Sequence, residues 1–325
     1  MTDLERIGQR LVTGFPGTAL TPELVQVVKE YKIGNIILFR ENIASADQLR
    51  TLCADLQTLI RSETGHDAFI MIDQEGGAVT RLPESCINVP GSMALAATGD
   101  PETTYLAGKL TGEELRSLGV NFNLAPSVDV NCNPANPIIG VRSYGDTPAT
   151  VAKYAAGMIR GLQDGGVLCL AKHFPGHGDT AEDSHTGLAY SYRTVEELAA
   201  CELLPFEAAA EVGPHAVMVG HIVVPELTSD LPATLCADAI ALVPDAENTL
   251  IVTDSLAMGA ITDSYTPGEA AVQALQAGCD VLLMPDGLAD AYDAVLAAVQ
   301  NGTLSEDRLD LSVNKILRMK AQFCA

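Results

Sequence analysis

The sequence predicts an α/β fold, a (β/α)8 barrel of the TIM type that fills residues 1–325 without a second domain. Short apolar runs rich in β-branched residues alternate with amphipathic segments of helical period, which indicates a parallel sheet with helical crossovers. The runs number eight, as such a barrel requires. No linker, charge block or change of composition divides the chain. One domain is therefore expected, with a strand order around the barrel that the sequence does not fix.

The expected strands share a short apolar core and precede a charged residue or a turn. In chain order they are Leu11–Phe15, Asn35–Phe39, Phe69–Asp73, Phe122–Ala125, Leu168–His173, Ala216–His221, Leu250–Asp254 and Val281–Pro285. Each is far shorter than the roughly 18 apolar residues of a membrane span.

Between these strands lie segments of good helix formers with apolar residues at helical spacing. The expected helices are Pro22–Tyr31, Ala46–Arg61, Thr104–Leu118, Thr150–Gln163, Val195–Ala210, Pro267–Ala277 and Gly287–Gln300. Thr194 and Glu197 have the spacing of a capping box, and Gly278 follows a helix as a left-handed cap would. The amphipathic segment Glu306–Ala325 would close the barrel.

Composition narrows the classes of partner and compartment. The chain has 19 basic and 42 acidic residues, and its formal net charge of −23 would repel nucleic acid and anionic lipid. Acidic residues near the start and the lack of a signal-type apolar run favour a cytoplasmic protein. The eight cysteines lack C-x-x-C spacing, so neither a disulfide framework nor a cysteine metal site is expected.

Charged side chains stand at the ends of several expected strands. Asp73, Lys172–His173, His221 and Asp254 all occupy such positions, whereas two arginines fall in the loops that follow strands, Arg81 and Arg142. Packing does not explain charges at the ends of buried strands. Because active sites of these barrels lie where the strands end, we expect one site at this mouth.

The loop from Lys172 to His185 holds the densest polar cluster of the chain. Three of the six histidines fall within thirteen residues of it, and Pro175, Gly176 and Gly178 argue against a regular helix. A solvated loop with incidental histidines is the alternative. The clustering directly after an apolar strand favours a functional loop, with a binding end at Lys172, a glycine-rich hinge and a mobile catalytic end.

Three residues have the chemistry of glycoside cleavage with retention. Asp183 can hold one nitrogen of His185, which leaves the other nitrogen to give or take a proton. Asp254 follows the strand Leu-Ile-Val-Thr and would attack as a carboxylate nucleophile. Asp254 could instead be the N-cap of a helix that begins at Ser255.

These motifs resemble family 3 glycoside hydrolases of the bacterial β-N-acetylhexosaminidase branch. The resemblance spans roughly residues 5 to 320, and its motifs occur in order. They are Ile72–Gly77 with Val79–Leu82, Asn123–Pro126 with Asp129–Val130, Arg142–Asp146, Lys172–Thr180 with Asp183–His185, His221 with Pro232–Thr234, and Thr253–Met258.

The resemblance assigns roles to particular residues. It implies that Asp254 is the nucleophile, that His185 is the general acid/base and that Asp183 orients it. It further implies that the terminal sugar is bound by Asp73, Arg81, Arg142, Lys172 and His173. Charged groups of these kinds can form charge-assisted hydrogen bonds to hydroxyls, although either arginine could instead be paired structurally with Asp73 or Asp146. No metal and no organic cofactor are implied.

Two departures from the wider family narrow the activity. Many relatives take the acid/base residue from a second domain, and many have tryptophan after the nucleophile. Here no second domain is expected, so the barrel itself would supply the acid/base, which favours His185; Ser255 follows Asp254, and the chain has no tryptophan. Both departures favour cleavage of an N-acetylglucosaminide over that of a glucoside, and we expect an exo-acting, retaining β-N-acetylglucosaminidase. The low aromatic content of 5% suggests a pocket for one terminal sugar.

The resemblance implies a cytoplasmic role in peptidoglycan recycling, with N-acetylglucosaminyl muropeptides or chitooligosaccharides as substrates. Phosphate could replace water as acceptor, since a histidine repels phosphate less than a glutamate would. Two alternatives from other classes remain. A metal-dependent amidohydrolase would use His173, His177, His185 and Asp254 as ligands, but no His-x-His motif ends the first strand. A non-catalytic sugar-binding protein would not need Asp254 together with the Asp–His pair.

Overall fold

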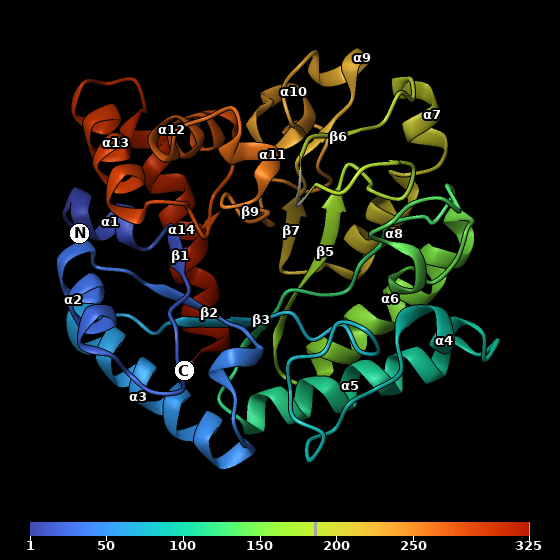
Figure 1. Ribbon diagram of the computed structural model, residues 1–325, viewed down its shortest axis with the longest axis horizontal. Coiled ribbons are helices and arrows are strands. Elements are labelled where there is room, and N and C mark those ends of the chain that lie inside the picture. The colour runs from blue at the N-terminus through green and yellow to red at the C-terminus, as the bar shows by residue number, and fades with distance from the viewer. Residues whose placement is uncertain (185–186, 325) are drawn as a thin grey trace.

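A computed structural model of the chain describes residues 1–184 and 187–324. Eight parallel strands form a nearly closed barrel (Figure 1), in the order β10-β1-β2-β3-β4-β5-β7-β9. A parallel bridge between Val252 of β9 and Val281, the residue before β10, completes the circle, because β10 also pairs with β1. The predicted (β/α)8 barrel is thus confirmed, and its strands follow chain order around the barrel.

The barrel strands mostly lie within the expected segments and are shorter, except β5, which runs one residue past its predicted end. They are β1 Leu11–Thr13, β2 Asn35–Leu38, β3 Phe69–Ile72, β4 Phe122–Asn123, β5 Leu168–Phe174, β7 Ala216–Val219, β9 Leu250–Thr253 and β10 Leu282–Leu283. A second, two-stranded parallel sheet pairs β6 Ala189–Tyr190 with β8 Ile222–Val223. This small sheet was not predicted. It ties the chain that follows the Lys172–His185 loop to the loop that follows β7.

The longer helices cover the outside of the barrel. They are α2 Pro22–Tyr31, α3 Ala46–Thr64, α5 Pro101–Ser117, α6 Pro148–Asp164, α8 Leu204–Val212, α12 Pro267–Ala277, α13 Leu288–Gln300 and α14 Glu306–Phe323. Short helices are α1 Asp3–Gly8, α4 Ser92–Ala96, α7 Val195–Ala200, α9 Pro225–Thr228, α10 Ala237–Ile240 and α11 Gly259–Thr262, with 3-10 turns η1 Arg40–Asn42, η2 Gly140–Arg142 and η3 Ala233–Leu235. In the described part of the chain, no helix is long and apolar enough to cross a bilayer.

The predicted helix Val195–Ala210 is wrong in one respect, because α7 and α8 divide it. Helix α7 has the expected capping box of Thr194 and Glu197, but it ends at Ala200. Pro205 lies in the first turn of α8 and has no N–H to donate to a preceding turn. A continuous helix is therefore disfavoured here, and Cys201 and Glu202 occupy the break.

Two apolar layers hold the barrel together. One lies between the sheet and the surrounding helices. The other fills the interior, where Phe69 and Phe122 meet edge to face at 5.4 Å between ring centroids. Ile316 and Met319 of α14 join this interior cluster. The final helix therefore closes the barrel as predicted, and the opposite mouth, where the strands end, is left for the site.

Candidate active site

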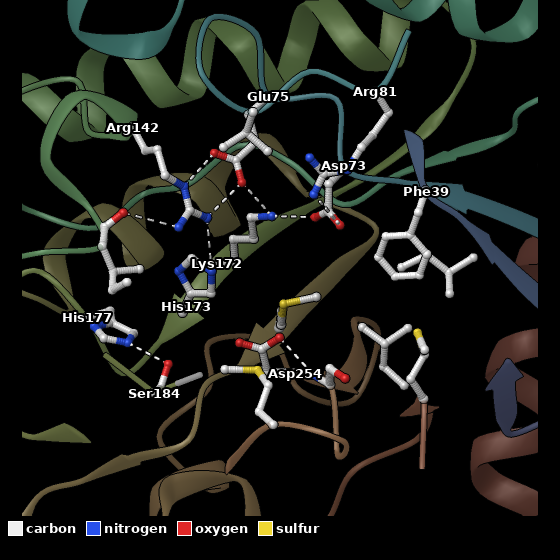
Figure 2. A pocket seen from close by; sticks show the side chains of 18 of the residues that line it. Phe39, Asp73, Glu75, Arg81, Arg142, Lys172, His173, His177, Ser184 and Asp254 are labelled. Carbon is white, nitrogen blue, oxygen red and sulfur yellow. Dashed lines mark hydrogen bonds and ion pairs between the residues drawn. The ribbon is translucent and has the colours of Figure 1, made fainter. Parts of the chain in front are cut away.

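A cavity of about 440 Å³ opens at the carboxyl ends of the strands (Figure 2). This size is in the range of pockets that hold small molecules. Its lining comes from most of the barrel strands and the loops after them: Ile37, Phe39, Asp73, Glu75, Val79, Arg81, Pro137, Ile138, Arg142, Lys172, His173, His177, Ser184, Met218, Asp254, Ser255, Met258, Leu283 and Met284. Six residues predicted to form the site therefore meet in one cavity: Asp73, Arg81, Arg142, Lys172, His173 and Asp254.

One wall of the cavity is an ion-pair network centred on Glu75. Lys172 Nζ lies 2.7 Å from Glu75 Oε1 and 2.8 Å from Asp73 Oδ1. Arg142 donates two hydrogen bonds to the Glu75 carboxylate, at 2.8 and 2.9 Å. Burial alone would raise the pKa of Glu75, but Lys172 and Arg142 lower it well below the ordinary value. Glu75 thus keeps two cations side by side, with Asp73 beside them at the cavity.

The two predicted sugar-binding arginines differ in their partners. Arg142 is paired with Glu75, and neither arginine forms an ion pair with Asp146 among the described residues. Arg81 Nη2 is 3.9 Å from Asp73 Oδ2, at the outer limit of an ion pair. Arg81 is therefore the more adaptable of the two cations.

His173 is fixed on both sides of its ring. Its Nδ1 lies 2.7 Å from Asp129 Oδ2, and its Nε2 lies 3.3 Å from Arg142 Nη2. Because a guanidinium has only donors, Nε2 serves as the acceptor and the proton resides on Nδ1. The ring is thereby held edge-on to the cavity.

Asp129 connects the ion-pair wall of the cavity to the loop that follows Lys172 and His173. It is buried and accepts hydrogen bonds from the main-chain N–H groups of His173 and His177 and from Ser127 Oγ. Burial raises the pKa of Asp129, but His173 and His177 outweigh it, so that the pKa lies below its usual value. The sequence pattern placed Asp129 in a motif without giving it this role.

The glycine-rich middle of the loop is packed against the loop after β4, and its role as a hinge remains a prediction. A Cβ on Gly178 would lie 1.7 Å from Val130 O. Asn136 Nδ2 donates to His177 O and Thr180 O at 2.8 and 2.9 Å. The middle of the loop therefore makes specific packing and hydrogen-bond contacts with the loop after β4.

His177 connects the middle of the loop to the cavity through two side-chain hydrogen bonds. Its Nδ1 is 2.7 Å from Thr180 Oγ1, and its Nε2 is 2.9 Å from Ser184 Oγ. Ser184 lines the cavity, so its hydrogen bond with His177 joins the loop to the cavity wall. His177 and Ser184, like Glu75, were missed as site residues, because a short polar motif does not reveal which side chains turn inwards.

The predicted acid/base pair lies at the end of this loop. Asp183 is half-buried next to Ser184. His185 lies outside the described residues, and its pairing with Asp183 remains a prediction.

Asp254 lies across the cavity from Glu75 and Lys172 (Figure 2). Its main-chain N–H donates to Val219 O at 2.9 Å, and its Oδ1 accepts the Ser255 N–H at 2.8 Å. Burial raises its pKa, but His173, His221, the Ser255 N–H and Lys172 lower it below the ordinary value. Asp254 therefore remains an ionised carboxylate at neutral pH.

The alternative role of Asp254 as a helix N-cap is wrong. The next helix, α11, begins at Gly259, and its N-cap is Met258. The predicted strand-end residue His221 is buried beside the cavity, where its Nε2 lies 2.8 Å from Ser255 O. His221 thus supports the turn that presents Asp254.

The geometry disfavours a metal-dependent amidohydrolase. Both ring nitrogens of His173 and of His177 already face protein partners. Among the described residues, the one group of three side chains spaced to hold a metal is Cys132, Cys201 and Glu202, none of which lines the cavity. His173 and His177 would each have to give up a hydrogen bond to bind a metal.

Comparisons with known proteins identify the family to which the chain is similar. The family model described as "Glycosyl hydrolase family 3 N terminal domain" matches residues 3–319. Beta-hexosaminidase A of Pseudoalteromonas piscicida is 36% identical over 94% of this chain and 56% of its own length. Beta-hexosaminidase LpqI of Mycobacterium tuberculosis is 33% identical over 97% of this chain and 82% of its own.

A solved structure of a family 3 β-N-acetylglucosaminidase from Paenibacillus superposes with a TM-score of 0.96 and 43% identity. It covers all of this chain, whereas this chain covers 64% of the Paenibacillus one. The chain therefore spans little more than half the length of some of its relatives. The barrel, the ordered motifs and these matches together show that the chain belongs to glycoside hydrolase family 3, whose N-terminal domain it matches.

Proposed function

We propose that this chain hydrolyses terminal, non-reducing β-linked N-acetylglucosamine with retention of configuration. The observation that carries the proposal is the position of Asp254, an ionised carboxylate. It lies across a cavity of the size of one sugar from a wall of charged side chains that can bind sugar hydroxyls. The printed names of the relatives, beta-hexosaminidase and β-N-acetylglucosaminidase, support the choice of sugar.

Cleavage would take place in two displacements. Asp254 attacks the anomeric carbon while His185 gives a proton to the leaving oxygen, which yields a glycosyl-enzyme and the free leaving group. His185, oriented by Asp183, then removes a proton from water as the water attacks the same carbon. Two inversions give net retention, and the nucleophile and the histidine return to their starting states.

The charged wall would hold the sugar for this attack. Asp73, Lys172 and Arg142 can form charge-assisted hydrogen bonds to the ring hydroxyls, with His173 and Arg81 beside them. Because Lys172 and Arg142 are already fixed by Glu75, little side-chain ordering is needed on binding.

The size and lining of the cavity support exo action on one terminal sugar. Phe39 is the one phenyl or phenol ring in the described lining, so a row of stacking platforms for a long glycan is missing there. We further propose a cytoplasmic role in peptidoglycan recycling, in which muropeptides are the natural substrates and chitooligosaccharides are also accepted.

A second candidate is transfer of the sugar to phosphate. A structural neighbour titled "Beta-glucoside phosphorylase BglX bound to 2FGlc" has a TM-score of 0.89 and 27% identity. A neutral histidine acid/base would admit phosphate more readily than a carboxylate would.

The test compares rates on 4-nitrophenyl β-N-acetylglucosaminide and β-glucoside, with the anomer first formed followed by NMR. We expect preference for the N-acetyl substrate and a β-product. An α-product or a preference for glucoside would contradict the proposal. A rate that rises with inorganic phosphate, with sugar 1-phosphate as product, would identify the phosphorylase.

A further inference from the structure

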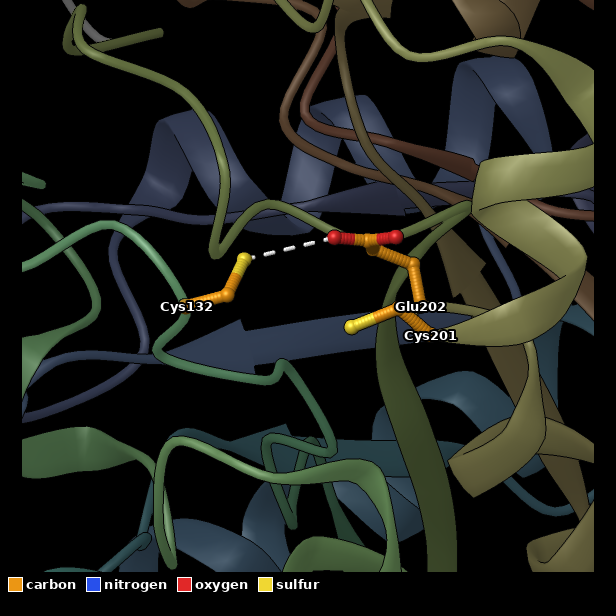
Figure 3. A group of neighbouring side chains, drawn as sticks. All are labelled: Cys132, Cys201 and Glu202. Carbon is orange, nitrogen blue, oxygen red and sulfur yellow. Dashed lines mark hydrogen bonds between the residues drawn. The ribbon is translucent and has the colours of Figure 1, made fainter.

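Two cysteines and a buried glutamate from distant parts of the chain meet near Asp179 of the Lys172–His185 loop, here called the catalytic loop (Figure 3). Cys132 lies in the loop after β4, whereas Cys201 and Glu202 occupy the break between α7 and α8. One ligand atom of each lies within 4.8 Å of the other two. None of the three lines the sugar cavity. The cluster is therefore separate from the active site.

The distances within the cluster suit tetrahedral ligation. Zinc–sulfur bonds of about 2.3 Å and zinc–oxygen bonds of about 2.0–2.2 Å separate neighbouring ligand atoms by roughly 3.3–3.8 Å. Cys132 Sγ lies 3.3 Å from Glu202 Oε1 and 3.9 Å from Asp179 Oδ1. The Cys132–Glu202 and Cys132–Asp179 separations are thus already close to those of a tetrahedral site, and Cys201 lies within 4.8 Å of Cys132 and Glu202.

Glu202 gives an independent reason to expect a ligand. It is 1% exposed, and its Oε2 is buried without a hydrogen-bond partner in the described part of the chain. Such a buried oxygen is costly unless something binds it. A cation bound by both oxygens of the Glu202 carboxylate would remove this cost, since Oε1 is the oxygen that faces Cys132.

A protein cation already occupies part of the cluster. Arg193 Nε lies 2.9 Å from Glu202 Oε1, and its Nη2 lies 3.3 Å from Cys132 Sγ and 3.4 Å from Asp179 Oδ1. The Arg193 side chain is 25% exposed, so it can swing out to solvent. The cluster is therefore built to hold positive charge, and the guanidinium satisfies it only in part.

We propose that Cys132, Cys201 and Glu202 bind a thiophilic divalent cation, Zn²⁺, with Asp179 as the fourth ligand and Arg193 displaced. Binding converts the two thiols to thiolates and releases their two protons to solvent. Asp179 belongs to the catalytic loop, and its main-chain oxygen already accepts a hydrogen bond from Asn133 Nδ2. The ion would thus join the catalytic loop to the α7–α8 break.

The test is titration of the fully reduced protein with Co²⁺, whose thiolate charge-transfer absorption reports sulfur ligands and not imidazole. We expect one Co²⁺ per chain, displaced by one equivalent of Zn²⁺. Cys132→Ser and Cys201→Ser should each weaken binding by roughly 100-fold or more, since even loss of an outer-shell partner costs about 10- to 100-fold. Cys86→Ser is the matched control, because Cys86 is also half-buried but lies outside the cluster.

Arg193→Gln keeps all four ligands and removes the competing cation, so it should bind Co²⁺ more tightly than the parent chain. If a ligand variant fails to fold, the Co²⁺ affinity of Arg193→Gln still tests the proposal. Unchanged or weaker binding by Arg193→Gln, or absence of the charge-transfer absorption in the parent chain, overturns the proposal. So does an absorption that survives in both serine variants, or formation of a Cys132–Cys201 disulfide without metal uptake by the reduced protein.

Discussion

The two sides of the sugar cavity are built in different ways. On the binding side, Glu75, Lys172, Arg142 and His173 satisfy one another through short polar contacts before any sugar arrives. On the reacting side, Asp254 projects from the turn after β9, and the predicted acid/base lies on a loop. The comparison teaches that the proposed sugar-binding groups are fixed by mutual charge pairing, whereas the proposed nucleophile is fixed by its backbone.

The difference also separates the expected effects of mutation. A change on the reacting side removes a reacting atom and leaves few charges unpaired. A change on the binding side leaves buried charges without partners. We therefore expect losses of rate on the reacting side and losses of both affinity and stability on the binding side.

Replacing the nucleophile should have the largest effect. Asp254→Ala should lower kcat by about 10⁴-fold or more, because no covalent intermediate can form. The melting temperature should change little. The measurement is steady-state kinetics on the 4-nitrophenyl substrate, beside sugar binding by calorimetry. Turnover close to that of the parent chain would remove Asp254 from the mechanism.

Replacing the acid/base should cost less and depend on the leaving group. His185→Ala should lower kcat by roughly 10²- to 10⁴-fold on a substrate with a poor leaving group, the usual range for general acid–base catalysis. Aryl leaving groups of low pKa should reduce the loss, because they need no proton. A loss that is equal for all leaving groups would contradict the role of His185. Asp183→Asn should show the same trend with a smaller loss.

Breaking the binding side should affect stability as well. Glu75→Gln leaves Lys172 and Arg142 close together without the charge that separates them, and we expect a loss of about 3 kcal/mol in unfolding free energy. KM should rise because the two cations move apart. Urea unfolding measures the first effect and kinetics the second. Glu30→Gln, at an exposed position, is the control and should stay within about 0.5 kcal/mol of the parent chain.

Lowering the pH should destabilise the protein by protonating the buried carboxylates Glu75 and Asp129. Burial raises the pKa of Glu75 and of Asp129, but the neighbouring cations lower both below their unfolded values. The stability contributed by such carboxylates is complete above the unfolded pKa of about 4 and is lost as pH falls from there towards the folded pKa. Unfolding free energies measured between neutral and acid pH should therefore fall in acid, and less steeply in Glu75→Gln. An equal slope in both chains would contradict this account of Glu75.

Arg81 should show the smallest effect. Its contact with Asp73 is long and partly exposed, so the pair contributes at most about 1 kcal/mol to stability. Arg81→Ala should raise KM by a few-fold and leave kcat and the melting temperature nearly unchanged. A large loss of kcat would place Arg81 among the groups that act in the transition state.

The alternation of apolar runs and helical segments was enough to predict the barrel, because strand and helix periods are local properties of the chain. The same local reading placed Asp73, Lys172, His173 and Asp254 at strand ends, where they line the cavity. Boundaries were less accurate where pairing was short, as at β4 and β10. The break between α7 and α8 was missed although Pro205 marked it.

The sequence by itself determined the (β/α)8 barrel and the residues that end its strands, since both follow from short-range periodicity. Only the tertiary structure decided which charges pair. Lys172 meets Asp73 across 99 positions of the chain, Arg142 meets Glu75 across 67, and His173 meets Asp129 across 44. It likewise brought Cys132 to Cys201, although their spacing alone argued against a metal site. Such pairs depend on how the barrel brings distant loops together at one end, and a local sequence pattern does not reveal which loops meet.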